Sequence, residues 1–258
     1  MGGRSGGAYR TVVVTGMGVV TPLGADLRGY WEALLQGRSA IGLVERFKDL
    51  PLPSRLGAEV RSFDPSAWID SREIRRMDRY AQFAVAASAL ALQDSGIGAG
   101  GLDPTRGAVV IGTGIGGLIE LESQHERMIR EGVEKLSPFL IPKMMANAAA
   151  GLVSIHAGWR GPCWCTASAC ASAGHAVASA LHLIRTGQAD AALAGGSEAC
   201  ITPLAMGGFG NMKALSTRNN DPARASRLFD RGRDGFVMGE GAGVMVLEEA
   251  GRARARGA

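Results

Sequence analysis

Aromatic residues make up only 5% of this 258-residue sequence, and charged residues make up only 20%. Hydrophobic residues nevertheless account for 46%, an ordinary fraction for a globular protein, which excludes an intrinsically disordered chain. The 38 glycines follow no three-residue period, so a collagen-like helix is excluded and many tight turns are indicated. A chain of this length can bury a sizeable core.

The sequence also lacks an apolar run of the roughly 18 residues that a membrane span requires. A long uncharged stretch, 161–184, is interrupted by Pro162 and His175. Near the amino terminus, Gly16 and Gly18 interrupt the first apolar segment, and no small-residue cleavage site follows it. We therefore expect a strand there and not a signal peptide, and we expect no membrane partner.

The sequence has a small net charge and few cysteines. The 28 lysines and arginines exceed the 24 acidic residues by too little to indicate a nucleic-acid partner, and we expect none. Only four cysteines occur, and three of them crowd into one short segment, which is unlike a secreted disulfide framework. We therefore expect a reducing compartment, the cytoplasm.

Apolar strand patterns alternate with helical patterns along the chain. The β-branched run Thr11–Gly16 ends in glycine and predicts a buried strand. The other expected strands are Ala108–Gly112, Cys163–Thr166, Ala189–Ala194 and Gly243–Leu247. Helices are expected at Leu27–Gln36, Met77–Gln93, Leu118–Arg130, Met144–His156 and Ala171–Arg185, and a further helix start follows the last strand.

This order of elements predicts the fold class. Strands that alternate with helices indicate an α/β fold, in which helices cover both faces of a mixed, mostly parallel sheet. No stretch has the composition of a linker. We therefore predict a single domain over residues 11–258, preceded by a flexible lead-in over residues 1–10.

A glycine-rich motif raises the possibility of nucleotide binding. Residues Gly112–Gly117 satisfy G-x-G-x-x-G, follow a predicted strand and open a predicted helix, as in a dinucleotide-binding oxidoreductase domain. The second strand that should end in an acidic residue is missing, since the sequence from Lys135 reads KLSPFLIP. The alternative is that these glycines let backbone segments pack closely beside a pocket.

The clustered cysteines do not have the spacing of a metal site. Cys163, Cys165 and Cys170 lack the second pair of ligands that zinc requires, and no histidine is spaced to supply it, so we expect no metal. Because side chains alternate along a strand, Cys163 and Cys165 share one face of the predicted strand 163–166. We expect both thiols to fill the core.

Cys170 differs from the others because it lies at a junction between a strand and a helix. Free N–H groups at a helix start favour a thiolate, and the small residues of segment 167–174 leave room for a substrate. The N–H of Cys170 itself can stabilise an oxyanion when the sulfur attacks a thioester carbonyl. From the residues alone, a buried structural cysteine remains an equal alternative.

Six blocks of sequence, spread in order over most of the chain, carry a family resemblance. They are Val14–Gly18 with Thr21–Gly24, Gly112–Gly117, Gly161–Gly174, Ala194–Glu198, Lys213–Asn219 and Asp234–Gly243. With these blocks the chain resembles the amino-terminal half of the β-ketoacyl-acyl carrier protein synthases, especially the synthase II group. The resemblance implies one half of the internally duplicated thiolase-like fold, a homodimer and no cofactor.

The resemblance also implies a reaction and its residues. An acyl group would pass from the phosphopantetheine thiol of acyl carrier protein to Cys170, before decarboxylative condensation with malonyl carrier protein in fatty-acid elongation. Ile115 and Leu140 match positions that line the acyl channel, and residues 112–117 match a loop near it, which displaces the dinucleotide interpretation. The positions that match contacts to the acidic carrier protein are Arg72, Arg75, Arg76, Lys135 and Lys213. Chain-length-factor relatives carry glutamine at the nucleophile position, and Cys170 argues against that subgroup.

One departure limits what this chain is expected to do. The family takes two catalytic histidines, a lysine and a second oxyanion donor from its carboxy-terminal half, which these residues do not include. The four histidines match none of those positions and are expected at the surface or in packing: His125, His156, His175 and His182. We therefore expect synthase activity that is incomplete in this chain. The alternative is a non-catalytic fragment that docks carrier protein or dimerises with an intact synthase.

Overall fold

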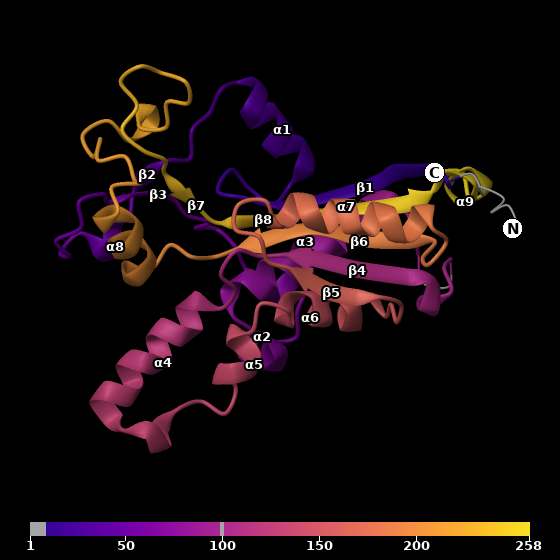
Figure 1. The fold of residues 1–258 in the computed structure, drawn as a ribbon, viewed down its shortest axis with the longest axis horizontal. Coiled ribbons are helices and arrows are strands. Elements are labelled where there is room, and N and C mark those ends of the chain that lie inside the picture. The colour runs from indigo at the N-terminus through magenta and orange to yellow at the C-terminus, as the bar shows by residue number, and fades with distance from the viewer. Residues whose placement is uncertain (1–8, 99–100) are drawn as a thin grey trace, which may run out of the picture.

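The computed structural model describes residues 9–98 and 101–258. In that part of the chain, a sheet of five strands lies at the centre and a sheet of three short strands lies towards one end (Figure 1). The central sheet contains, in spatial order, β1 (Val12–Val20), β8 (Gly241–Glu249), β6 (Ala191–Glu198), β4 (Gly107–Gly112) and β5 (Cys163–Thr166). The small sheet contains β2 (Gly42–Leu43), β3 (Leu56–Ala58) and β7 (Met238–Gly239). Residues 1–8 of the expected lead-in lie outside the described part.

The central sheet is mixed, as the sequence predicts. Strand β4 is parallel to both β5 and β6, whereas β8 is antiparallel to both of its neighbours, β6 and β1. Within the described residues, four of the five strands therefore run in one direction and β8 runs against them. The prediction of a mostly parallel sheet is confirmed.

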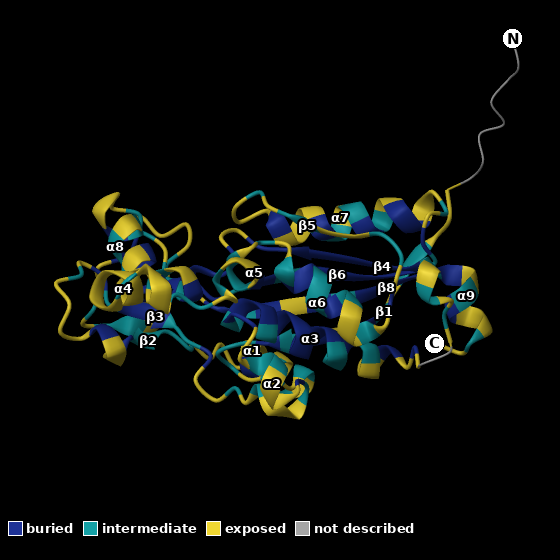
Figure 2. Cartoon of the chain, turned by 90° about the horizontal axis from the view of Figure 1, so that it is seen from below, coloured by how far each residue is buried: buried dark blue, intermediate teal, exposed yellow. Residues whose placement is uncertain are grey.

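Helices cover both faces of this sheet (Figure 1). The helices are α1 (Leu27–Leu35), α2 (Ser71–Ile74), α3 (Arg79–Ser95), α4 (Leu118–Glu131), α5 (Leu140–Met144), α6 (Ala148–Ala157), α7 (Ser172–Arg185), α8 (Pro203–Asn211) and α9 (Ala250–Ala255). Helices α3 and α6 pack on one face with Val109 and Ile111 of β4, and α7 packs on the other face with Ala108 and Val110. Strand β4 is therefore buried on both faces, which explains its unbroken apolar run. Figure 2 shows the buried strands between α7 on one side and α3 and α6 on the other.

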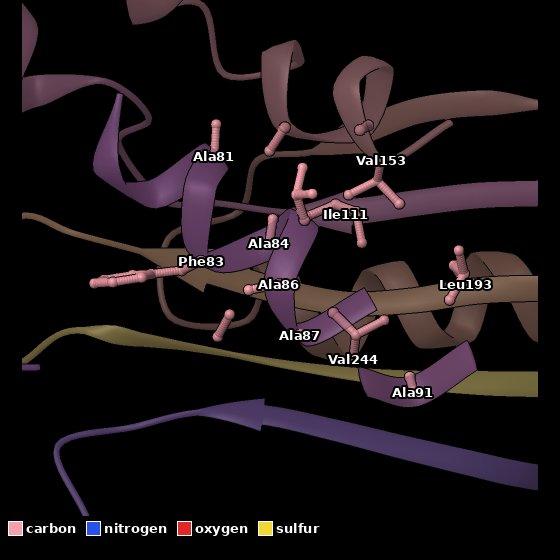
Figure 3. Packing of buried hydrophobic residues seen from close by; sticks show 14 of the residues in the cluster. Ala81, Phe83, Ala84, Ala86, Ala87, Ala91, Ile111, Val153, Leu193 and Val244 are labelled. Carbon is pink, nitrogen blue, oxygen red and sulfur yellow. The ribbon is translucent and has the colours of Figure 1, made fainter. Parts of the chain in front are cut away.

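Helix α3 lies unusually close to the sheet. Its sheet-facing side chains are small, including Ala84, Ala87 and Ala91 (Figure 3). A Cβ atom on Gly18 of β1 would lie 2.1 Å from the Ala87 carbonyl oxygen. The glycines that suggested the end of the first strand are therefore inside it, where they make room for α3. The predicted end at Gly16 was wrong.

Both edges of the central sheet are more exposed than the sequence suggested. Within the described residues, strand β1 pairs only with β8, and its Val14 is 49% exposed, so the expectation of a buried strand was wrong. Strand β5 forms the other edge. There Cys163 is exposed and Cys165 is half-buried, which contradicts their predicted role as core residues. A strand at an edge has neighbours on only one side.

The described residues include no helix with both the length and the hydropathy needed to cross a membrane.

Candidate active site

Cys170 lies in a tight turn between β5 and α7, and its side chain is exposed. The preceding residue, Ala169, has a positive φ of 53°, a left-handed conformation that residues other than glycine rarely adopt. The Ala171 N–H donates to the Ser168 carbonyl at 3.2 Å, and the Ser172 N–H donates to the Ala169 carbonyl at 3.1 Å. The chain therefore turns sharply into α7, and Cys170 occupies the outside of that turn.

The Ser172 side chain lies beneath the turn and is buried. Its hydroxyl accepts from the Ser168 N–H at 2.9 Å, and it lies 2.7 Å from the Ala169 carbonyl and 3.1 Å from the Thr113 carbonyl. Nearby, the Thr166 hydroxyl donates to the Ser172 carbonyl at 2.8 Å. The turn at Cys170 is thus joined to the start of the glycine-rich loop.

The glycine-rich loop holds a carboxylate of its own chain. Glu198, the last residue of β6, accepts from the Gly114 N–H at 2.6 Å, the Ile115 N–H at 3.3 Å and the Thr113 hydroxyl at 3.0 Å. Burial raises the pKa of Glu198, while these donors oppose the rise. Two backbone N–H groups that would be needed to bind a phosphate are therefore engaged by Glu198. This geometry argues against the dinucleotide interpretation.

The alternative role of these glycines, close packing, agrees with the structure. A Cβ atom on Gly112 would lie 2.4 Å from the Ser172 carbonyl oxygen, and one on Gly117 would lie 2.4 Å from the Lys143 carbonyl oxygen. The glycines therefore let β4 and the loop approach α7 and α5. Close to the turn, Gly114 has the Ala169 backbone as a neighbour.

Burial affects the thiols of the other three cysteines. Burial raises the pKa of the Cys163 and Cys165 thiols and raises that of Cys200 to about 12. All four cysteines are free. In the part of the chain that the structure describes, no group of three or more His, Cys, Asp or Glu side chains is arranged to hold a metal ion.

All four histidines are exposed. Of the two locations expected from the sequence, the surface and the packed interior, the structure shows the surface. His175, in the first turns of α7, has its Nδ1 atom 2.6 Å from the Ser168 hydroxyl. His156 has its Nε2 atom 3.1 Å from Glu73. His125 and His182 lie on α4 and α7.

The two expected acyl-pocket residues lie on neighbouring segments. Ile115 is in the glycine-rich loop, next to Gly114, which has the Ala169 backbone as a neighbour, and Ile115 is 42% exposed. Leu140 is half-buried and begins α5, whose last residue, Met144, accepts from the Gly117 N–H at 3.2 Å. Gly114 thus connects the loop that bears Ile115 to the turn, whereas Leu140 lies at the opposite end of α5 from Met144, the residue that contacts the loop.

The expected docking residues occupy more than one part of the surface. Arg72 lies in α2, Arg75 and Arg76 follow it, and all three are exposed. The Arg76 guanidinium lies 5.1 Å from the centre of the Phe139 ring, which precedes α5. Lys135 and Lys213 are also exposed, but Lys213 follows α8, which Figures 1 and 2 place in a different region from α2.

A large cavity lies elsewhere. It has a volume of about 540 Å³ and is lined by segments 20–25, 38–42 and 59–63, none of which contains an expected site residue. Three residues that sequence reasoning overlooked lie in the turn and in the loop joined to it: Thr113, Ser172 and Glu198. A signal existed for each, because all three lie inside matched blocks of sequence: Gly112–Gly117, Gly161–Gly174 and Ala194–Glu198.

Comparisons with known proteins agree with this arrangement. A family model described as "Beta-ketoacyl synthase, N-terminal domain" matches residues 9–253. The 3-oxoacyl-acyl-carrier-protein synthase 2 of Synechocystis sp. is 47% identical over 249 residues, which cover 96% of this chain and 60% of that protein. The protein of the same name from Vibrio harveyi is 45% identical with the same coverage. This chain therefore spans about 60% of the length of these relatives.

Solved structures give the same result. A β-ketoacyl synthase from Burkholderia phymatum aligns with a TM-score of 0.88 at 36% identity, covering 97% of this chain and 61% of that one. The complex "AntDE:AntF (apo): type II PKS acyl-carrier protein in complex with its ketosynthase bound to the hexaketide" aligns with a TM-score of 0.84 at 29% identity, covering 97% and 60%. The resemblance seen in the sequence and the expected fold are confirmed. The chain belongs to the β-ketoacyl synthase family and corresponds to its amino-terminal domain.

Proposed function

We propose that this chain supplies the nucleophilic half of a β-ketoacyl-acyl carrier protein synthase of fatty-acid elongation, with Cys170 as the acyl acceptor. The observation that carries the proposal is the position of Cys170. It is an exposed cysteine on a left-handed turn at the start of α7, beside the loop that bears Ile115. The same turn lies in a block that matches the family. Curated relatives named for this activity at 41–47% identity support the substrate class.

The first half-reaction requires few groups. The Cys170 thiolate attacks the thioester carbonyl of an acyl carrier protein, a new carbon–sulfur bond forms, and the bond to the phosphopantetheine sulfur breaks. The departing thiolate takes up a proton, and the acyl group remains on Cys170. Negative charge develops on the carbonyl oxygen in the transition state, and a backbone N–H at this turn is suited to stabilise it.

The second half-reaction uses the bound acyl group. A malonyl carrier protein loses CO₂, and the resulting carbanion attacks the carbonyl carbon of the acyl-Cys170 thioester. The carbon–sulfur bond to Cys170 breaks, and a β-ketoacyl product two carbons longer leaves on the carrier. The family resemblance assigns the imidazole donors of this step to the carboxy-terminal half.

We propose acyl carrier protein as the partner. Supporting this, Arg72, Arg75 and Arg76 are exposed, and none takes part in an ion pair within residues 9–98 and 101–258. Such free positive charge suits an acidic partner. The AntDE:AntF structure contains an acyl-carrier protein bound to its ketosynthase.

The homodimer and the cytoplasmic location are also proposals. The exposed edge strand β5, with Trp164 37% exposed, offers unpaired backbone groups that a second copy can pair with. The free thiols are compatible with a reducing compartment.

The experiment is to mix this chain with an acyl-carrier-protein thioester and to measure both carrier thiol release and protein mass. Stoichiometric release with an equal gain of acyl mass supports the proposal. Carrier binding without any acyl transfer would favour the alternative, a docking fragment.

A further inference from the structure

The residue before Cys170 has an unfavourable backbone conformation. Ala169 adopts a φ of 53°, where the Cβ atom of an L-residue crowds the following carbonyl. Asparagine or aspartate can offset this cost with a local side-chain hydrogen bond, but alanine has no such group. Strain of this kind persists only where the surrounding structure imposes it, and it is concentrated at functional sites. Contacts from neighbouring residues must therefore hold Ala169.

The buried hydroxyl of Ser172 contacts the turn on both sides of Ala169. It accepts from the Ser168 N–H at 2.9 Å, and its oxygen lies 2.7 Å from the Ala169 carbonyl oxygen. The single hydroxyl hydrogen can be donated to only one acceptor at a time, and the Thr113 carbonyl is the more distant candidate at 3.1 Å. The Ser172 hydroxyl thus bridges the Ala167–Ser168 peptide group and the Ala169–Cys170 peptide group, which stand on either side of Ser168 and Ala169.

One of these contacts bears directly on Cys170. The Ala169 carbonyl and the Cys170 N–H belong to the same planar peptide group and point in opposite directions. A hydrogen bond that fixes the carbonyl towards Ser172 therefore directs the Cys170 N–H away from α7. In our proposal, the thioester approaches the exposed Cys170 thiol from that side.

We propose that Ser172 is a positioning residue for acyl transfer, because its hydroxyl holds Ala169 left-handed and thereby aligns the Cys170 N–H with the developing oxyanion. The inference rests on the proposed role of Cys170. The Ala169 carbonyl also accepts from the Ser172 N–H at 3.1 Å. Removal of the hydroxyl therefore leaves one of the two hydrogen bonds from Ser172 to that carbonyl in place.

The test compares two reactions of the same sulfur. Acyl transfer from an acyl-pantetheine thioester needs the aligned N–H, whereas alkylation by iodoacetamide forms no oxyanion. We expect Ser172→Ala to slow acylation of Cys170 roughly tenfold and to change its alkylation less than about twofold. Cys163 in the same molecule serves as an internal standard for alkylation, and Ser179→Ala on α7 is the matched control, with wild-type rates expected.

A second variant separates positioning from packing. Glycine adopts a positive φ without steric cost, so Ala169→Gly combined with Ser172→Ala should restore acylation to within about threefold of wild type. If Ser172 acted only by filling space, the double variant would remain as slow as Ser172→Ala. That result, or a wild-type acylation rate in Ser172→Ala, would overturn the proposal. If Ser172→Ala alone fails to fold, the acylation rate of the double variant is compared with that of Ala169→Gly. A tenfold difference between these two rates would overturn the proposal.

Hydrogen exchange separates this inference from the proposed function. Without the hydroxyl, the Ser168 N–H loses its acceptor, and the backbone amides of segment 168–172 should exchange faster. If the wild-type protein takes up no acyl group at all, the proposed function fails. Hydrogen exchange alone then tests whether the Ser172 hydroxyl holds the turn. Equal exchange in wild type and Ser172→Ala would then refute it.

Discussion

At the scale of single residues, buried acids show how the fold constrains its charges. Asp78 precedes α3 and accepts from the Tyr80 N–H at 3.2 Å and from the Glu120 N–H at 2.8 Å. Burial nevertheless raises the pKa of Asp78 to about 6. Close by, the Lys143 ammonium pairs with Glu120. The Arg106 and Arg10 guanidinium groups have the opposite effect on Asp190 and lower its pKa to about 2.

Asp78 should give the protein a pH-dependent stability. In an unfolded chain its pKa is about 3.9, so the folded protein keeps a proton that the unfolded chain has lost. This stabilisation is fully present below about pH 4 and is lost as the pH rises through about 6. Relative to wild type, Asp78→Asn should therefore gain about 2 kcal/mol of unfolding free energy between pH 4 and pH 7. Urea unfolding measures this difference.

The control for this measurement is Asp26→Asn, at the exposed amino-terminal cap of α1. Asparagine is also a good N-cap, so both variants retain their helix starts. A pH dependence of Asp78→Asn that runs parallel to that of wild type would show that Asp78 does not titrate in this range.

The exposed arginines near α2 allow a direct test of carrier docking. Reversal of two charges, in Arg75→Glu with Arg76→Glu, should weaken carrier-protein binding about tenfold at low salt. The difference should shrink as salt screens the interaction. Titration calorimetry at two salt concentrations measures both effects.

A matched variant, Arg231→Glu with Arg254→Glu, changes the same number of exposed charges outside the proposed surface. It should bind as wild type does. Equal binding by wild type and the Arg75 and Arg76 variant at low salt would refute the docking proposal.

At the scale of elements, prediction from sequence succeeded where apolar runs were long. The strand at 107–112 and the helices at 118–131 and 172–185 were found because their patterns extend over several residues. Strands β2, β3 and β7 and helix α2 have four residues or fewer, so no periodicity could reveal them. Helix α8 was missed because three glycines disfavour a helix, although Thr202 and Pro203 form a recognisable helix start.

The close contact between α3 and β1 gives a prediction about one glycine. In Gly18→Ala the new Cβ atom would lie 2.1 Å from the Ala87 carbonyl oxygen and 2.5 Å from the Ala91 nitrogen. Both atoms are helix backbone and cannot move independently, so the variant should lose about 3 kcal/mol of unfolding free energy. Chemical denaturation checks the loss.

Gly243→Ala on the adjacent strand β8 is the control. Gly243 pairs with Val19, and a Cβ atom there would meet no atom within 4 Å. Its unfolding free energy should stay within about 0.5 kcal/mol of wild type. Similar losses of unfolding free energy in both variants would contradict the prediction. They would mean that replacing a strand glycine is itself destabilising and that contact with α3 does not determine the loss.

At the scale of the whole molecule, the site was only partly predictable. Cys170 and its turn follow from a local motif, since a strand, a small-residue run and a helix are adjacent in sequence. The hydrogen-bonded residues Thr113, Ser172 and Glu198 come from three separate segments, and only the folded sheet brings them together. Likewise, the exposure of Cys163 depends on β5 being an edge strand, which no local pattern encodes.

These 258 residues alone should take up an acyl group without completing the condensation. Each oxyanion or enolate donor that is missing costs about 10² to 10³ in rate, and the family resemblance places the imidazole donors in the carboxy-terminal half. Product analysis with acyl and malonyl carrier thioesters checks this, with and without a separately produced carboxy-terminal half of a relative. Abundant β-ketoacyl product from the chain alone would contradict the prediction and would direct attention to His175, which lies beside the Cys170 turn.

The central claim, that Cys170 is the acyl acceptor, is tested most directly by locating the acyl group. Wild-type chain is incubated with acyl carrier thioester, digested and mapped by mass spectrometry. The account predicts acyl mass on the peptide that contains Cys170, none on Cys163, Cys165 or Cys200, and no label in Cys170→Ala. Label that persists in Cys170→Ala, or that maps to Cys163, would contradict it.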